Sequence, residues 1–162
     1  MIPGKLDLIV TLSAPTIDPD GSRAVVSAVR PSFEADAYVG QLWQIDIDDS
    51  LPPLRLTRGF RDTDPAFSPD GGRIAFLRAV PGGKPQLAVV DARGGEPRVL
   101  TDAPLGVQSF AWDRTGTRIA FVARRPEPLR YGTTEGVSSA QEPPRRIRGN
   151  KYQMNGVGYV TD

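Results

Sequence analysis

The stretch that decides the fold is AFSPDGGRIAF at residues 66–76, because two related stretches accompany it. TIDPDGSRAVV occupies residues 16–26, and AWDRTGTRIAF occupies residues 111–121. In all three copies an arginine follows the marker glycine by two residues. The glycines are 50 and then 45 residues apart. A fixed period of this size indicates an internal repeat with one supersecondary unit per copy.

Each copy contains a turn between two apolar segments. In the second copy proline stands at the second turn position and glycine at the fourth, an order that is typical of a type I turn. The first copy has the same order, and the third keeps only the first aspartate and the glycine. We therefore predict structural repeat turns at Pro19, Asp20, Gly21, Pro69, Asp70, Gly71, Asp113 and Gly116.

Two further elements repeat in phase with these turns. QLWQID at residues 41–46 matches QLAVVD at 86–91, and RLT at 55–57 matches VLT at 99–101. Each full unit thus carries four apolar segments, and four short strands in about 40–50 residues are the signature of a propeller blade. The run after each turn, such as residues 74–77, is almost continuously apolar, which predicts strands covered on both faces.

The predicted fold is all-β: a partial β-propeller with two full four-stranded blades, half of a third blade and a long insertion. Residues 1–13 form a lead-in segment, residues 14–123 the blades, and residues 124–162 a blade-three insertion that stops before the next strand. The 17 glycines and 16 prolines are too many for a helix bundle. Because propellers close with about four to eight blades, we expect the polypeptide to continue beyond Asp162.

The composition excludes several kinds of chemistry. The chain has no histidine and no cysteine, which removes imidazole bases, thiolate nucleophiles, disulfides and the usual zinc, haem and iron–sulfur sites. Two aspartate groups carry part of a calcium-loop pattern but lack its bidentate glutamate, which favours turn formers. They are Asp18 and Asp20 beside Gly21, and Asp46, Asp48 and Asp49. We predict no catalytic, cofactor-binding or metal-binding residue in this chain, and no cofactor.

The charge and hydropathy suggest neither nucleic acid nor a membrane as a partner. The net charge is +1, so no anionic surface is required. No apolar run approaches the ~20 residues of a membrane span. Residues 1–14 make a poor secretory signal, because Asp7 interrupts a short apolar patch. These features predict a cytoplasmic protein.

The C-terminal stretch contains RYGT at residues 130–133, EPPRRI at 142–147 and NGVGY at 155–159. Together with the repeats, these resemble the third-blade insertion of the prolyl oligopeptidase family, in its acylaminoacyl-peptidase branch. Members of that family are serine peptidases in which an N-terminal propeller caps an α/β-hydrolase domain with a Ser-Asp-His triad. The resemblance implies part of a substrate-gating propeller, in a full-length serine peptidase that cleaves short or N-acylated peptides.

The sequence departs from a complete member of that family. It has no histidine, no Gly-x-Ser-x-Gly elbow and no alternating helix–strand pattern. No catalytic residue is therefore carried over, and this 162-residue chain alone is predicted to be non-catalytic. The partners that the resemblance implies are the protein's own C-terminal α/β-hydrolase domain and short peptides, with oligomerisation left open.

Two rival functions are compatible with the same propeller fold. The fold alone does not decide between them and the peptidase interpretation. A non-enzymatic interaction propeller of the Tol-system type has the same Ser-Pro-Asp-Gly repeats, but a signal peptide and uninterrupted blades would favour it. A stand-alone sugar or metabolite enzyme would be expected to show histidine or a dense carboxylate cluster. The insertion after the half blade and the poor signal favour the peptidase interpretation.

Two further groups admit both a functional and a structural interpretation. Arg145, Arg146 and Arg148 form a local basic run, which would meet a partner domain or gate substrates if it is functional. The alternative, a solvated loop, suits the nearly neutral chain better. Trp43 and Trp112 lie within apolar segments, so we predict that they pack in the core rather than serve as ligand platforms.

Overall fold

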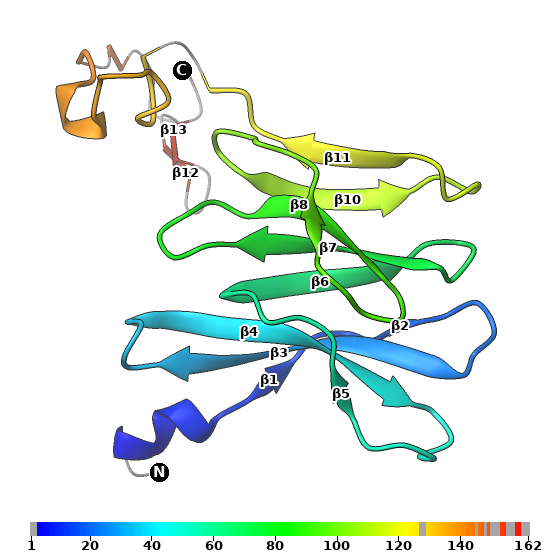
Figure 1. Cartoon of the computed structure of the whole chain (residues 1–162). Coiled ribbons are helices and arrows are strands. Elements are labelled where there is room, and N and C mark those ends of the chain that lie inside the picture. The colour runs from blue at the N-terminus through cyan, green and yellow to red at the C-terminus, as the bar shows by residue number, and fades with distance from the viewer. Residues whose placement is uncertain are drawn as a thin grey trace. The chain divides into compact units, whose positions relative to one another are not determined.

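The computed structural model describes residues 3–126, 129–144, 146–147, 149, 153–154 and 158–159. The chain divides into two compact units, Met1–Ala123 and Arg124–Asp162. In the described residues the regular structure consists of strands and two 3-10 helices (Figure 1). No described helix is long and apolar enough to cross a membrane.

The first repeat unit follows a 3-10 helix, η1 (Pro3–Leu8), and has a split first strand. Its strands are β1 (Thr11–Leu12), β2 (Thr16–Ile17), β3 (Arg23–Ser32), β4 (Ala37–Asp46) and β5 (Leu54–Arg55). Both β1 and β2 pair with β3, β3 pairs with β4 over ten residue pairs, and β5 pairs with β4, all antiparallel. The first strand thus begins at Thr11, inside the segment predicted as the lead-in.

The second and third units repeat this order. The second contains β6 (Arg61–Phe67), β7 (Arg73–Ala79), β8 (Gln86–Asp91) and β9 (Arg98–Val99), paired antiparallel in sequence order. The third contains β10 (Val107–Trp112) and β11 (Ile119–Ala123), which pair antiparallel with each other. A single parallel bridge between Gly40 and Arg61 joins the first two units in one nine-stranded sheet.

The core lies between successive units rather than inside any one of them. One buried cluster joins Val25 and Leu42 of the first unit to Ile74 and Phe76 of the second. A second cluster joins the other side of the second unit, at Ala75 and Leu77, to Val107 of the third, with partly buried Trp112 packed against it. The central strand β7 is therefore covered on both faces, as the continuous apolar run predicts. These four-stranded units, packed face to face, confirm the partial propeller.

The third unit departs from the buried pattern. Phe121 is 49% exposed and Val122 is 55% exposed, although β11 shares the residues Ile-Ala-Phe with β7. Among the described residues no third strand extends the β10–β11 sheet. The unit Arg124–Asp162 holds a 3-10 turn, η2 (Ser139–Gln141), and a short hairpin of β12 (Gln153–Met154) with β13 (Gly158–Tyr159). This hairpin was not expected from the sequence.

Candidate functional site

The three repeat glycines occupy equivalent turns between the first and second strands of their units. Gly21, Gly71 and Gly116 have φ values of 77°, 69° and 68°, a left-handed backbone that glycine adopts without a steric penalty. Each donates its N–H to the carbonyl three residues earlier, at 3.0, 2.8 and 3.1 Å respectively. The first turn residue therefore has the same backbone role in all three units.

A side-chain oxygen at the first turn position closes each turn. Asp18, Ser68 and Asp113 accept a hydrogen bond from the backbone N–H of the repeat arginine five residues later, at 3.0, 2.9 and 3.0 Å. Asp20 and Asp70, at the third position, accept from the N–H two residues on, at 2.9 and 3.1 Å. These aspartates have structural roles in the turns, and no group of described residues forms a metal-ion cluster.

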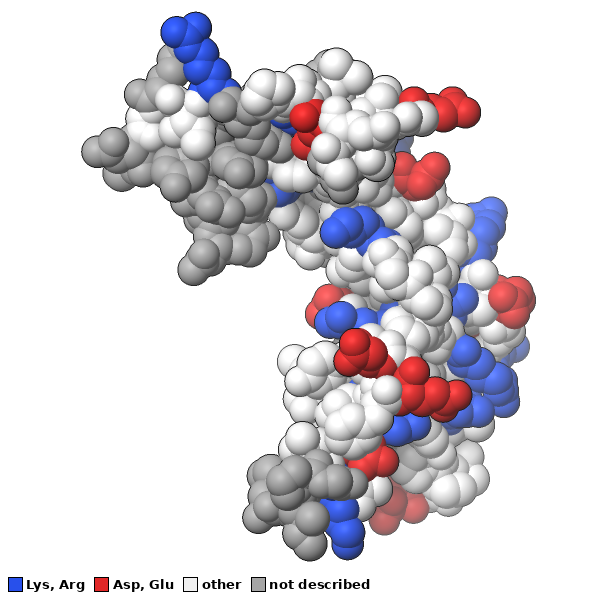
Figure 2. Space-filling view, turned by 90° about the vertical axis from the view of Figure 1, so that its left-hand side faces the viewer, with Lys and Arg blue, Asp and Glu red and all other residues white. Residues whose placement is uncertain are grey.

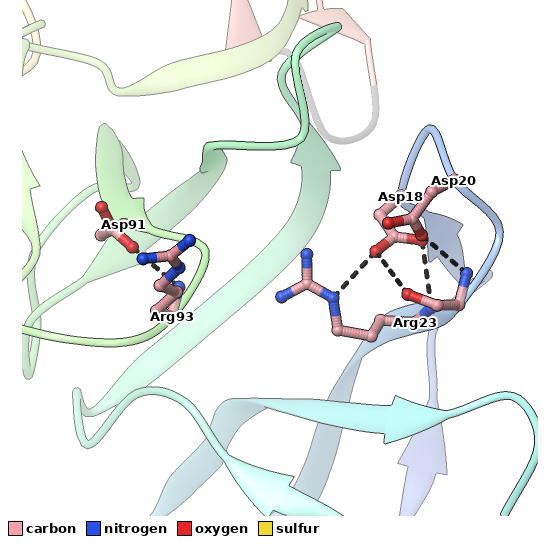
Figure 3. A network of polar contacts seen from close by, with 6 residues as sticks. Asp18, Asp20, Arg23, Asp91 and Arg93 are labelled. Carbon is pink, nitrogen blue, oxygen red and sulfur yellow. Dashed lines mark hydrogen bonds and ion pairs between the residues drawn. The ribbon is translucent and has the colours of Figure 1, made fainter.

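Asp18 is the most deeply buried aspartate of this network, at 4% exposure. Its Oδ2 lies 2.8 Å from Nε of Arg23 (Figure 3). Burial alone would raise the pKa of Asp18, but the hydrogen bonds from the Arg23 backbone and side chain outweigh it and lower the pKa below 3.8. Asp18 therefore stays ionised and holds Arg23 at the surface between units.

A polar pocket of about 360 Å³ lies beside this turn, between the first and second units. Its lining includes Asp20, Arg23, Asp70 and, across the pocket in Figure 3, Asp91 and Arg93. The carboxylates of Asp20, Asp70 and Asp91 already accept backbone hydrogen bonds. With Asp18, the described lining holds four aspartates and two arginines, and the aspartates are already engaged in turn hydrogen bonds or the ion pair with Arg23. On the face seen in Figure 2, acidic and basic side chains are interspersed.

A repeated contact connects each turn to the next unit. The guanidinium of Arg23 lies 5.9 Å from the ring centre of Phe67, and that of Arg73 lies 5.3 Å from Trp112. Nη2 of Arg73 also donates to the carbonyl of Gly116 at 2.6 Å. Phe67 and Trp112 occupy the same position of the repeat, so this Arg–aromatic contact is part of the repeat. The matching phases of these residues in the sequence could have revealed it.

The first strands of all three units line a groove of about 460 Å³. Residues 13–15, 64–66 and 108–110 contribute, together with Leu77 of β7. Side chains cross from unit to unit here: Thr16 Oγ1 accepts from the N–H of Phe67 at 3.2 Å, and Trp112 Nε1 donates to the carbonyl of Ala66 at 3.1 Å. We name this feature the inner groove, and it is the candidate binding site.

Irregular pairing shapes the inner groove. The register between β6 and β7 shifts between Thr63 and Ala66, and the register between β10 and β11 shifts between Val107 and Ser109. A bulge redirects side chains and ends regular pairing. At the β6 bulge Asp64 takes a φ of 53°, a left-handed conformation that aspartate adopts more readily than most residues. Nothing in the local sequence marked this bulge as a site.

The remaining residues considered in the sequence are three arginines of the unit Arg124–Asp162 and two tryptophans of the unit Met1–Ala123. Arg146 is exposed, while Arg145 and Arg148 lie outside the described residues. Trp112 is partly buried against the second core cluster, and Trp43 is half-buried in β4, opposite Val26. Both tryptophans thus pack within the sheets.

The chain matches no protein-family model. It is 32% identical over 152 residues to YuxL of Bacillus subtilis, an uncharacterized peptidase; the match covers 93% of this chain and 23% of YuxL. The Pyrococcus horikoshii acylaminoacyl peptidase has the same fold at a TM-score of 0.63 and 17% identity, over 95% of this chain and 22% of the peptidase. The resemblance to a peptidase is confirmed by the sequence match, and the structural match shows that this region has the fold of part of an acylaminoacyl peptidase. The chain spans less than a quarter of the length of these peptidases.

A third similarity is to a protein that is not named as a peptidase. The structure of a putative TolB from Agrobacterium tumefaciens matches 73% of this chain and 39% of that protein, with a TM-score of 0.57 and 26% identity. The repeat fold is therefore common to a peptidase and to a TolB-type protein. The fold does not separate the two functions.

Proposed function

We propose that this chain is part of the substrate-gating N-terminal propeller of a serine oligopeptidase of the prolyl oligopeptidase family. In this proposal the full-length protein cleaves short or N-acylated peptides, and an α/β-hydrolase domain outside this chain carries the catalytic triad. The observation that carries the proposal is the 32% identity to a peptidase over 93% of the chain. The absence of histidine from the chain is consistent with catalysis elsewhere.

The inner groove supplies a route for the gating role. It is lined by the first strands of three successive units, which face the axis of a propeller. The packed clusters between units fix the spacing of these strands, so the groove has a defined width. A passage built in this way would admit an extended short peptide and exclude a folded protein.

The proposal is tested by assaying the full-length protein with N-acetylated and free tripeptide nitroanilides and with a folded protein substrate. We expect hydrolysis of the short substrates, loss of activity with a serine-directed inhibitor, and no cleavage of the folded protein. A Ser109→Trp variant narrows the inner groove and should raise KM for longer peptides. Ala35→Trp, on an exposed loop away from the inner groove, is the matched control. Absence of peptide hydrolysis would reject the proposal.

The alternative is a non-enzymatic interaction propeller of the Tol-system type, and the 26% identity to the putative TolB favours it. The two functions predict different results in one experiment. A scaffold would bind a protein partner through the exposed turns and would hydrolyse no peptide. Retained partner capture in a preparation without peptidase activity would favour the scaffold.

A further inference from the structure

The described residues give the inner groove one charged side chain. Of the ten described residues that line it only Asp64 is charged, and the others are apolar, hydroxyl or amide residues. Asp64 is exposed, so its carboxylate is accessible from the groove. A single negative charge in an otherwise neutral groove gives the groove a definite electrostatic preference.

Unlike four nearby aspartates of the repeats, Asp64 has neither an ion pair nor a backbone hydrogen bond to its carboxylate among the described residues. Asp18 and Asp62 are ion-paired with arginines, and Asp20 and Asp70 accept backbone hydrogen bonds in turns. Asp64 accepts one long hydrogen bond, from Thr63 Oγ1 at 3.3 Å. Within the described residues it has no ion-pair partner. Its carboxylate is therefore free to bind a cationic group.

The backbone of the inner groove favours recognition through side chains. Pro15 and Pro65 lie next to the irregular positions of the first two units, and proline has no N–H to donate. A peptide that added a strand to these edges would lack donors at these positions. Contacts from groove side chains, Asp64 above all, would therefore distinguish one peptide from another.

We propose that the inner groove selects peptides that carry a lysine or arginine side chain, and that Asp64 is the specificity-determining residue. The inference rests on the proposed function, in which peptides pass this groove. An N-acylated peptide has no terminal ammonium group, so its positive charge must come from a side chain. At a separation of about 4 Å a partly screened ion pair favours the cationic peptide by about tenfold.

The test is equilibrium binding, by fluorescence anisotropy, of three labelled acetylated pentapeptides that differ only in a central Lys, Gln or Glu, measured after a serine-directed inhibitor has blocked hydrolysis. The full-length protein should bind the Lys peptide about tenfold more tightly than the Gln peptide, with the preference weakening as salt is added. Asp64→Asn should abolish the preference while keeping the fold, because asparagine also tolerates a left-handed backbone. Asp36→Asn is the matched control, since Asp36 is exposed, lies outside the groove and has a φ of 45°.

Equal binding of the Lys and Gln peptides, or a preference that survives Asp64→Asn, would overturn the inference. The peptidase assay separates this result from the proposed function. Hydrolysis without any charge preference would leave the peptidase standing and remove the role of Asp64. Charge-selective binding without hydrolysis would support the role of Asp64 in binding and would reject the peptidase activity.

Discussion

The second and third units carry nearly the same apolar strand but place it in different surroundings. Phe76 is fully buried, while Phe121, at the same position of the repeat, is 49% exposed. The second unit has a neighbouring unit on each face, whereas the contact seen for β11 within residues 3–123 is toward the second unit, through Ile119. The difference teaches that an apolar run specifies a strand, and that the neighbouring sheets decide how much of it is buried.

The largest expected effect is on the core of the second unit. Phe76→Ala should lower the free energy of unfolding by about 3–5 kcal/mol, because it removes a large side chain and leaves a cavity between two units. Phe121→Ala should cost less than about 1 kcal/mol, since its ring is half in solvent already. Urea unfolding of both variants measures the difference. Equal losses would show that the third unit is as well packed as the second.

The next effect concerns Asp62 of the second unit. Val107 occupies the equivalent position in the third unit. Asp62 is fully buried and forms a two-pronged ion pair with Arg78, with nitrogen–oxygen distances of 2.8 and 2.9 Å. Asp62→Asn should destabilise the chain by about 3 kcal/mol, because a largely buried guanidinium loses its counter-charge. Val107→Ala is the comparison and should cost about 1–3 kcal/mol. A fully stable Asp62→Asn protein, again by urea unfolding, would contradict this view of the pair.

A smaller effect is expected at the Arg–aromatic contact between units. Arg73→Ala should cost about 1–2 kcal/mol, because it removes the contact with Trp112 and the hydrogen bond to the carbonyl of Gly116. Arg118→Ala should cost almost nothing, since the Arg118 guanidinium has no partner among the described residues. Thermal unfolding of the two variants provides the comparison. A larger loss of stability from Arg118→Ala than from Arg73→Ala would contradict the stabilising role given to the Arg73 contact.

The smallest effect is a pH dependence of the third turn. The hydrogen bond from the Thr115 side chain, followed by the Arg118 backbone N–H, lowers the pKa of Asp113 below 3.8. A carboxyl whose pKa is lowered in the folded state stabilises the protein at pH values above its unfolded-state pKa. This stabilisation is lost as the pH falls through the folded-state pKa. Asp113→Ser, which copies Ser68 of the second unit, should therefore lose less stability than the wild type below about pH 4. Unfolding curves between pH 7 and pH 2.5 measure this, and parallel losses would contradict it.

Much of the fold could be predicted because the turn chemistry is local. Pro69, Asp70 and Gly71 specify a turn within four residues, and the phase of Gly21 and Gly116 then gives the repeat. The repeated glutamine (Gln41 and Gln86) and threonine (Thr57 and Thr101) are also explained by hydrogen bonds within one unit. Gln86 accepts from Thr101 Oγ1, and the same hydroxyl accepts from the N–H of Leu87 at 2.9 Å, which holds the fourth strand on the third.

The inner groove could not be predicted because it depends on contacts between residues about 50 positions apart. The left-handed backbone of Asp64 arises from a shift of register against β7, which no short motif encodes. The pairing of Asp62 with Arg78 likewise follows from their opposite positions in the sheet. The sequence shows an aspartate beside a proline at Asp64, which by itself is typical of any turn.

Hydrogen exchange of this chain, resolved by strand, tests the repeat architecture most directly. The packing predicts slow exchange in β7 and β8, which lie between two units, and fast exchange in β11, whose second edge pairs with no strand among the described residues and whose Phe121 and Val122 are exposed. Amides of residues 119–123 should therefore exchange well before those of residues 73–79. Equal protection of the two strands, or faster exchange in β7, would contradict an arrangement of successive units packed face to face.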